Sequence, residues 1–590
     1  MSALPKARKK FVAVLIKPSH YDDEGYVIQF WRSFIPANTL AVLYSLIRDC
    51  AEKQVFGEDV DFEILPIDEL NTKVEPHKLI EKIKEADGGF VGMVGVQSNQ
   101  YPRALDLARE FRAAQIPVVI GGFHVSGSIS MLPGIQPELQ EAIALGVTLF
   151  AGESEGRMAD LLRDIWNGTT KPIYNYMNDL PNVEGAPTPY LPADVAKKVA
   201  GWYSSFDSGR GCPFQCSFCT IINVQGRVSR HRSPDDIAQA IRANAREGVK
   251  RFIITDDNFA RNAQWEAILD KLIELRKVEK IRMKYFIQVD ALSYKIPGFI
   301  DKCKKAGIST AFIGIESVNP ENLVAMKKLQ NRLDEYRLCI QAWKRAGVTV
   351  IIGYIVGMPN DTRESMLRDI KVIQDELPVD IIEMLILTPL PGSEDHQKLF
   401  EKQVAMDADL NSYDLYHVVK DHEKMSRKEL RDAYHEAYLS FFSEEHVERI
   451  LRRSHVNGRP AHSLVYWMCL YHGSMYIEHV HPMEAGLIRR RHRHQRRPGL
   501  PIESRFVFYP KRVREMSWKG YQWFKLWRRN KRIANKIERD PQAMEYTDLA
   551  LRPPSASDET DLHLLTDFED TRRAFKKRVK AAVEADREAV

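Results

Sequence analysis

One stretch decides the fold of this chain: Arg210-Gly211-Cys212-Pro213-Phe214-Gln215-Cys216-Ser217-Phe218-Cys219-Thr220. Three cysteines fall within eight residues, on a segment whose glycine and proline favour a loop. Three thiolates so close together can hold one iron–sulfur cluster, because the irons of such clusters are bound by cysteine sulfur. A four-iron cluster with only three protein ligands leaves one iron open to a small molecule. The spacing therefore predicts a reactive cluster rather than one that only carries electrons.

A zinc site is the alternative for these cysteines. Zinc is commonly bound by four Cys or His ligands, and His231 lies twelve residues beyond Cys219. The uneven cysteine spacing, the aromatic side chain of Phe218 and the strand–helix alternation that follows favour the cluster.

The whole chain has the composition of a globular protein with several domains. It has 590 residues, 44% of them hydrophobic, and a net charge of +5. The seven cysteines are odd in number and unevenly placed, which argues against a disulfide framework and for a reducing compartment. The basic N-terminus precedes an apolar run of only strand length, and the apolar residues 464–477 are too short to span a bilayer. We therefore expect a cytoplasmic protein.

The first segment, residues 1–170, alternates short apolar runs with helical patterns. Five strands separated by helices predict an α/β fold with a doubly wound parallel sheet (Rossmann-like, flavodoxin-like), whose ligands lie beyond the carboxyl ends of the strands. The expected strands are 11–17, 61–67, 89–96, 117–120 and 147–151, and the expected helices are 38–53, 77–85 and 102–114. No G-x-G-x-x-G follows the first strand, which disfavours a nicotinamide or flavin dinucleotide.

The same alternation returns after a linker. Residues 171–199 are proline-rich and are predicted to separate two domains. In the core, residues 200–395, a first strand at the cysteine loop and five later ones predict an incomplete, TIM-like (β/α)6 barrel. The later strands are expected at 251–255, 284–289, 310–315, 348–356 and 381–388, and the helices at 233–247, 262–277, 297–306, 333–346 and 362–376.

The C-x3-C-x2-C pattern with Phe218 resembles the signature of the radical SAM superfamily. With the sheet upstream, residues 10–395 resemble the cobalamin-dependent (vitamin B12) family of radical SAM enzymes. The resemblance implies a [4Fe–4S] cluster held by Cys212, Cys216 and Cys219, with S-adenosylmethionine bound to the open iron. It implies reductive cleavage of S-adenosylmethionine to a 5′-deoxyadenosyl radical and, in the commonest outcome, methylation of an unactivated carbon. An electron donor such as flavodoxin or ferredoxin is implied as a partner.

Polar residues and glycines at successive strand ends of the barrel match the family's contacts to S-adenosylmethionine. Carboxylate and amide oxygens suit its ammonium and hydroxyl groups, and bare backbone or an aromatic ring suits its adenine. The resemblance assigns this role to Phe218, Asp256, Asp257, Asn258, Glu316, Ser317, Gly353, Ile355 and Gly357.

The strand ends of the first sheet match the groove for cobalamin in the same way. Paired glycines at a strand end let a ligand approach the backbone closely. The resemblance assigns cobalamin contacts to Ser98, Gly121, Gly122, His124, Gly152 and Glu153. One feature departs from the family: no D-x-H-x-x-G follows the first strand, and His20 lacks that context. We therefore expect no protein histidine below the cobalt.

The C-terminal region is expected to be a helical accessory domain, residues 396–550, followed by a polar tail, 551–590. Residues 486–532 hold sixteen Lys and Arg against two acids. Aromatic residues are interleaved with them: Phe506, Phe508, Tyr509, Trp518, Tyr521, Trp523, Phe524 and Trp527. Three interpretations fit this stretch: a solvated basic face, a surface that binds an anionic membrane, or a surface that binds nucleic acid. The aromatic clustering favours the membrane over nucleic acid.

Other functions remain open at this point. The same two cofactors could cyclise, oxidise or rearrange a substrate instead of methylating it, and the substrate itself, a small molecule or a lipid-like one, cannot be read from the chain. A methylthiotransferase acting on tRNA would carry a second three-cysteine cluster in the N-terminal domain, where this chain has only Cys50. A non-enzymatic cobalamin sensor with a structural cluster is the remaining alternative.

Overall fold

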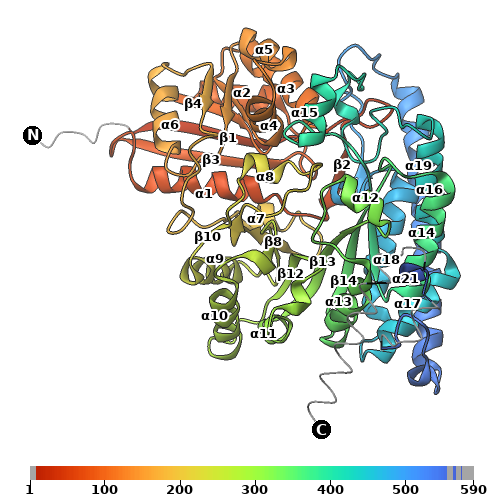
Figure 1. Ribbon diagram of the computed structural model, residues 1–590. Helices are drawn as coiled ribbons and strands as arrows, with labels where there is room; N and C mark the ends of the chain where they lie inside the picture. The colour runs from red at the N-terminus through yellow and green to blue at the C-terminus, as the bar shows by residue number, and fades with distance from the viewer. Residues whose placement is uncertain (1–7, 554–561, 567–572, 574–590) are drawn as a thin grey trace, which may run out of the picture.

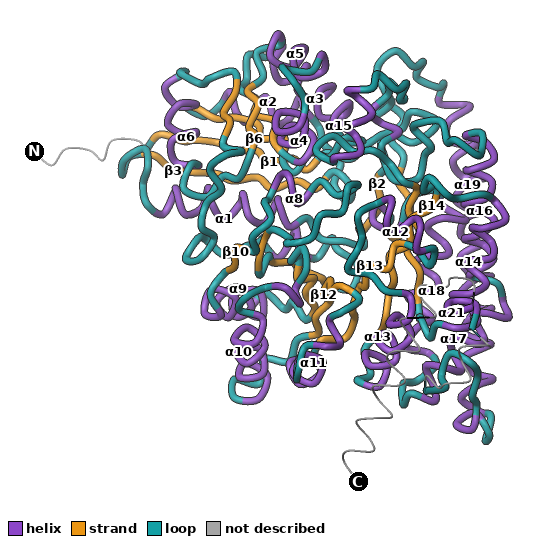
Figure 2. Tube along the Cα trace, viewed as in Figure 1, coloured by secondary structure: helices purple, strands orange, loops and turns teal. Residues whose placement is uncertain are grey.

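The computed structural model describes residues 8–553, 562–566 and 573, so most of the expected polar tail lies outside the described residues (Figure 1). An N-terminal sheet with its helices lies beside a second sheet, and a bundle of C-terminal helices runs along the far side of that second sheet (Figures 1 and 2). None of the helices in the described part of the chain combines the length and apolar character that crossing a bilayer requires.

The N-terminal sheet is parallel and has the strand order β3-β1-β4-β5-β6-β7. Along β1, Phe11, Ala13 and Leu15 face one apolar layer, and the alternate residues Val12, Val14 and Ile16 face the other. A strand buried on both faces needs helices on both sides, which is the doubly wound fold. The strands are β1 (Lys9–Lys17), β3 (Val60–Asp68), β4 (Gly88–Met93), β5 (Val118–Gly121), β6 (Thr148–Ala151) and β7 (Ile173–Asn175). The helices are α1 (Asn38–Glu52), α2 (Pro76–Lys84), α3 (Tyr101–Ala113), α4 (Phe123–Met131), α5 (Pro137–Ala144) and α6 (Met158–Asn167).

The sixth strand corrects the sequence prediction. Five strands were expected to end at residue 151, but β7 pairs with β6 from within the expected linker. Its three residues are too few for an apolar pattern, and only the exposed edge of β6 makes them a strand. The rest of the proline-rich segment carries the short helix α7 (Ala193–Ala196).

The second sheet is the predicted open barrel. Its six parallel strands follow the order β15-β14-β13-β12-β11-β8, and its end strands are not paired with each other. The strands are β8 (Tyr203–Phe206), β11 (Arg251–Ile254), β12 (Lys284–Asp290), β13 (Ile308–Glu316), β14 (Thr349–Val356) and β15 (Ile381–Ile386). The helices are α9 (Pro234–Arg246), α10 (Trp265–Lys277), α11 (Phe299–Ala306), α12 (Pro320–Ala325), α13 (Leu333–Arg345), α14 (Arg363–Glu376) and α15 (Glu394–Glu401). The α9 N-terminus is a capping box of Ser233 and Asp236, as the Ser-Pro start of this helix suggested.

The C-terminal helices complete the barrel rather than standing apart from it. The Tyr434 hydroxyl donates to the Met384 carbonyl at 3.1 Å, and the Tyr471 hydroxyl donates to Glu383 at 2.9 Å, so two helices are bound to β15 at the edge of the barrel. One continuous apolar core joins these helices to the barrel strands. The helices are α16 (Arg427–Phe441), α17 (Glu444–Val456), α18 (His462–Gly473) and α19 (Arg505–Arg539), and the short α21 (His563–Thr566) follows.

A small antiparallel ribbon connects the N-terminal and C-terminal regions of the chain. Strand β2 (Gln29–Ser33) pairs with β16 (Gly486–Arg490), a strand inside the region expected to be helical. The basic run that follows is largely neutralised within the fold: Arg491 lies 2.7 Å from Asp22 and 2.9 Å from Glu24. Much of the positive charge at 489–497 therefore holds the ribbon in place, and most of the exposed basic and aromatic side chains of residues 486–532 belong to α19.

Candidate active site

The cysteine loop is held in place by backbone pairing on both sides. The two-residue strands β9 (Gly209–Arg210) and β10 (Arg230–His231) pair antiparallel and close the loop at its base. At the top of the barrel, the Gly211 amide donates to Asp257 at 2.7 Å. Burial raises the pKa of Asp257 to about 7. Because His231 pairs with Gly209 and does not line the cavity that contains the cysteines, the zinc alternative lacks its fourth ligand there.

The three cysteines line one cavity of about 340 Å³ at the mouth of the barrel. None of the three forms a disulfide, and burial raises the pKa of Cys219 to about 12, so a bare thiol at Cys219 would stay protonated. A bound cation reverses this preference, since a metal-bound thiol loses its proton. Three soft ligands around an enclosed space fit an iron–sulfur cluster with one iron free.

Five of the residues assigned to S-adenosylmethionine line this cavity with the cysteines: Phe218, Asp257, Asn258, Glu316 and Ile355. They come from the cysteine loop and from the ends of β11, β13 and β14, which the barrel brings to one place. The Asn258 side-chain amide donates to Asp290 at 3.0 Å, and Asp290 also lines the cavity. Their contacts with S-adenosylmethionine stay predictions.

The other four residues assigned to S-adenosylmethionine do not line this cavity: Asp256, Ser317, Gly353 and Gly357. Asp256 is fully buried and accepts hydrogen bonds from Ser208 at 2.8 Å and Asn262 at 2.7 Å, so it supports the strand end from behind. Ser317 accepts a hydrogen bond from the Asn319 amide, which turns the chain into α12. The two glycines make room for neighbours. A Cβ at Gly353 would lie 2.7 Å from the Phe312 ring, and one at Gly357 would lie 3.0 Å from Leu430.

Lys328 is a site residue that sequence reasoning missed. Its ammonium lies 2.8 Å from Glu316 and 5.9 Å from the centre of the Phe218 ring, inside the same cavity. Burial lowers the pKa of Lys328, but Glu316, Cys216 and Cys219 outweigh burial and raise it, so the amine is charged. No local signal marks this lysine, because it sits in an irregular segment after α12. Asp290, in contrast, ends a predicted strand, so the strand-end rule could have found it.

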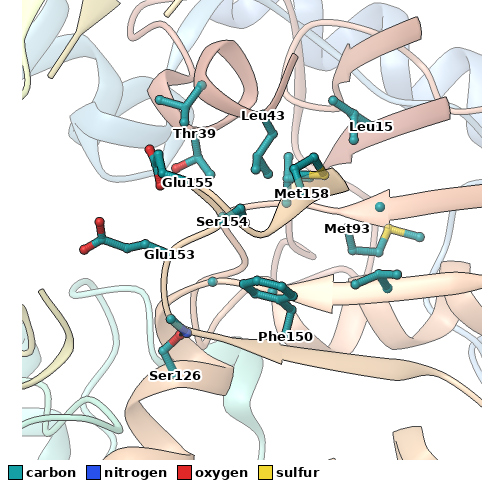
Figure 3. Close-up of a pocket in the computed structure, with 18 of the residues that line it drawn as sticks. Leu15, Thr39, Leu43, Met93, Ser126, Phe150, Glu153, Ser154, Glu155 and Met158 are labelled. Carbon is teal, nitrogen blue, oxygen red and sulfur yellow. Dashed lines mark hydrogen bonds between the residues drawn. The ribbon is translucent and has the colours of Figure 1, made fainter. Parts of the chain in front are cut away.

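A second cavity lies at the carboxyl edge of the N-terminal sheet (Figure 3). In Figure 3, Glu153 and Glu155 extend toward one side of the cavity, and Phe150, Met93 and Met158 lie at the other. Four predicted cobalamin contacts line it: Gly121, Gly122, Gly152 and Glu153. Gly122 has a φ of 146°, and a Cβ there would overlap the backbone of Val96, so only glycine fits this turn. The cavity has a volume of about 160 Å³, and its apolar walls and bare backbone suit the apolar ring at one end of a larger cofactor.

The other two predicted cobalamin contacts face away from this cavity. His124 Nδ1 lies 3.1 Å from Ser98 Oγ, and its Nε2 lies 3.6 Å from Glu138. Both side chains are buried between α3, α4 and α5, where they stabilise the sheet edge. This position does not favour their predicted contacts with cobalamin, and the sequence pattern could not decide it because a residue after a glycine turn can point to either side of the strand end. His20 is also occupied elsewhere: its Nε2 lies 2.8 Å from Glu484.

Residues 207–373 match the family model described as the radical SAM superfamily. The chain carries a radical SAM domain.

Relatives and solved structures extend the likeness beyond this domain. Bacteriochlorophyllide d C-8(2)-methyltransferase of Chlorobaculum tepidum is 28% identical over 355 residues, which are 56% of this chain and 73% of that protein. The radical S-adenosylmethionine methyltransferase TsrM of Kitasatospora setae, solved with cobalamin and a [4Fe–4S] cluster bound, superposes with a TM-score of 0.52 at 15% identity and covers 68% of this chain and 79% of that one. The cobalamin-dependent S-adenosylmethionine radical enzyme OxsB, solved with aqua-cobalamin bound, gives a TM-score of 0.53 at 13% identity over 97% of this chain and 84% of that one. The predicted combination of a Rossmann-like sheet and an open radical SAM barrel is confirmed.

The two cavities share a thin wall that belongs to the radical SAM domain. Helix α8 (Ile221–Val224) follows the last cysteine; Ile221 and Ile222 line the cysteine cavity, and Val224 and Gln225 line the N-terminal one. One helical turn therefore separates the two spaces.

Arg210 joins the cysteine loop to the sheet. Its guanidinium is buried and lies 2.6 Å from both Glu153 and Glu155, which follow β6, and 2.7 Å from Asp207. Arg230 also pairs with Glu153, at 2.5 Å. A buried arginine that satisfies three carboxylates from two domains fixes their relative position, because removing it would leave those charges unpaired.

A contact between two glycines brings the same domains together at the backbone. Gly127 of α4 faces the loop after β15, and a Cβ on Gly127 would lie 2.8 Å from the Cα of Gly392 and closer still to the Pro391 carbonyl. The Asn223 side chain of α8 donates to the Gly392 carbonyl at 2.9 Å. The helix after the glycine turn, the cysteine loop and the last barrel strand thus meet at one point, beside the wall between the cavities.

Proposed function

We propose that this protein is a cobalamin-dependent radical SAM enzyme that methylates an unactivated carbon of an apolar small molecule. The observation that carries the proposal is the shared wall: residues 221–225 face the cysteine cavity on one side and the sheet cavity on the other. A methyl carrier and a radical source must lie close to one substrate carbon, and this arrangement supports such proximity.

The cysteine cavity is proposed to hold the cluster and S-adenosylmethionine. The bound groups supply the radical chemistry and the methyl group, and the protein binds and orients them. Cys212, Cys216 and Cys219 bind the cluster. Glu316 and Lys328 offer a carboxylate and an ammonium for the hydroxyl and carboxylate groups of S-adenosylmethionine, while Phe218 and Ile355 pack against its adenine.

The sheet cavity is proposed to hold cobalamin. Phe90, Val119, Phe150 and Met158 supply apolar walls for the ring of its nucleotide tail, and the bare backbone at Gly121 and Gly122 admits the tail between the strands. Ser126 is already fixed, since its hydroxyl accepts from the Gly152 amide at 3.0 Å.

The substrate class follows from the remaining wall of the cysteine cavity. Apolar side chains line that side, four from β15 and its following loop and one from the segment between α15 and α16: Leu385, Ile386, Leu387, Leu390 and Leu415. They keep this side of the cavity apolar, and they suit a hydrocarbon face of the substrate better than a charged one. A relative named for an action on bacteriochlorophyllide agrees with a large apolar substrate.

Association with an anionic membrane surface is part of the proposal, as is an electron donor such as flavodoxin or ferredoxin. Helix α19 exposes a row of large apolar side chains at helical spacing: Phe506, Tyr509, Val513, Met516, Phe524 and Trp527. Exposed cations lie beside them, among them Arg505, Arg514, Lys525 and Arg528. Aromatic and basic side chains on one long helix favour binding at a negatively charged lipid surface.

Anaerobic purification with iron, sulfide and corrinoid quantified together tests the proposal. We expect four irons and one corrinoid per chain, and S-adenosylmethionine cleavage to 5′-deoxyadenosine in the presence of a reductant. Cys216→Ala should lose both the cluster absorbance and the cleavage, whereas Cys303→Ala, at a buried cysteine of α11, should keep both. Four irons without corrinoid would refute the cobalamin assignment alone. A consumed substrate whose product lacks the mass of an added methylene would replace methylation with cyclisation or rearrangement.

A further inference from the structure

A third cavity, which the proposed function does not use, lies between β16, α18 and α19. Its volume is about 440 Å³, within the range of about 300–1,000 Å³ typical of ligand sites. Apolar side chains form most of its walls: Tyr466, Leu470, Leu487, Met516, Trp523 and Trp527. Its polar lining consists of three cationic side chains and one acid: Arg489, Arg512, Lys519 and Glu478.

Trp523 forms the floor of this cavity and packs against the backbone of α18 at Gly473. A Cβ at Gly473 would overlap the Trp523 ring, so the indole lies directly on α18. Trp523 Nε1 donates to Glu478 at 3.0 Å, and the Lys519 ammonium lies 2.8 Å from the same carboxylate. These bonds hold the wall rigid, so the space between the helices is kept open rather than left by loose packing.

Gly520 keeps one side of the cavity open. It lies in the middle of α19, where glycine costs about 1 kcal/mol relative to alanine. Apart from its chain neighbours and the nearby backbone of α19 itself, no described atom lies within 4 Å of the position that a Cβ would take, so packing gives no reason for this glycine. The missing side chain instead leaves room beside Met516 and Trp527 in the cavity lining.

Arg489 lines the cavity, and one donor atom of its buried guanidinium group has no hydrogen-bond partner. The residue is 4% exposed; its Nη1 donates to the Glu478 carbonyl at 3.2 Å and its Nη2 to Asp22 at 3.0 Å. Its Nε is buried and has no hydrogen-bond partner. Such a donor costs about 1–3 kcal/mol when it stays unpaired.

We propose that this cavity binds a long-chain carboxylate, with the apolar chain between α18 and α19 and the carboxylate at Arg489. Charge supports the head group: three cations and one acid line the space, and Asp22 and Glu515 reach Arg489 and Arg512 from outside the lining. The mouth is apolar too, because Ile488 is 59% exposed and Trp527 44% exposed at its rim. The site goes beyond the proposed function and does not depend on it.

Fluorescence titration of the full-length protein with cis-parinaric acid, displaced by oleate, tests the site. We expect one saturable site per chain, and at least tenfold weaker oleate binding in Gly520→Leu, whose side chain fills the opening. Gly520→Ala is the matched control: it makes the same helix-stabilising change but adds only a methyl group, and its affinity should stay within twofold. Both variants should melt at or above the wild-type temperature, which separates a filled cavity from a damaged fold.

Two further results decide the proposal. Methyl oleate, which lacks the charge, should bind at least tenfold more weakly than oleate, and equal affinity would overturn the head-group contact with Arg489. Unsaturable binding in the wild type, or unchanged affinity in Gly520→Leu, would overturn the site itself. Because no step requires the cluster, cobalamin or S-adenosylmethionine, failure here would leave the proposed function untouched.

Discussion

Gly127→Ala should weaken the junction between the two cofactor domains without touching either cavity. The new Cβ would lie 2.8 Å from the Gly392 Cα, whereas ordinary contacts begin at 3.4 Å, so the domains must separate by at least 0.6 Å at this point. Overpacking of this kind costs about 1–3 kcal/mol. The helix itself gains about 1 kcal/mol from the change, so Gly520→Ala, a helical glycine with free space around it, is the matched reference.

The measurement is chemical denaturation of both variants, combined with pulsed EPR of the loaded protein. Relative to Gly520→Ala, Gly127→Ala should lose about 1–3 kcal/mol of unfolding free energy. The reduced cluster speeds the spin relaxation of cob(II)alamin, and this enhancement should fall as the two groups separate, with iron and corrinoid contents unchanged. A misplacement of about 1 Å can reduce a rate by about a hundredfold, so product formation should fall more than S-adenosylmethionine cleavage. Equal stability of the two variants, together with unchanged relaxation, would refute the reasoning that this contact sets the spacing.

Three further predictions concern single sites. Lys328→Met should raise the Kd for S-adenosylmethionine by about tenfold to a hundredfold, because one charged contact of about 1.5–3 kcal/mol is lost. The cluster absorbance should stay the same. An unchanged Kd in equilibrium dialysis would contradict this prediction. Burial lowers the pKa of His20, but the neighbouring Glu484 outweighs burial and raises it. Burial raises the pKa of Glu484, but His20 and its other partners outweigh burial and lower it to about 2. The stabilisation that charged His20 provides is complete below pH 6.5 and is lost as the pH rises through its raised pKa. The stabilisation that charged Glu484 provides is complete above pH 4.5 and is lost as the pH falls toward 2. His20→Gln should therefore lose most stability, against the wild type, between pH 4.5 and 6.5, and a difference in melting temperature that does not vary with pH would argue against the pair. Replacing Phe506 and Phe524 by serine should reduce co-sedimentation with anionic vesicles at least tenfold and leave oleate binding unchanged; equal sedimentation would remove α19 from the membrane proposal.

The proposed membrane surface and the proposed oleate cavity share Met516 and Trp527 of α19, but the two roles can be tested separately. Phe506 is 92% exposed and does not line the cavity, whereas Gly520 lines the cavity and offers no apolar side chain to a lipid surface. Vesicle binding that responds to the phenylalanines and oleate binding that responds to Gly520 would therefore establish two distinct roles for one helix.

Local patterns of the sequence were enough for the architecture. The spacing of Cys212, Cys216 and Cys219 and the alternation of apolar runs with helical patterns predicted the cluster loop, the parallel sheet and the open barrel, because each depends on residues close together in the chain. The strand-end rule also located Asp257, Asn258, Glu316 and the Gly121-Gly122 turn at the two cavities. Short elements such as β7 and β2 were missed, since they form only where an edge strand is available to pair with them.

Contacts between distant segments were decided by the tertiary structure alone. Lys328 enters the cysteine cavity from an irregular segment, His124 turns to Ser98 instead of to the N-terminal cavity, and Asp256 supports the strand end from behind. The basic run near Arg491 finds Asp22 more than 460 residues away and loses the free charge that its composition suggested. Each outcome depends on which side chains the fold brings together. The sequence by itself therefore predicted the chemistry of the cysteine loop, while packing between Gly127, Gly392 and Arg210 decided how close the two cavities lie.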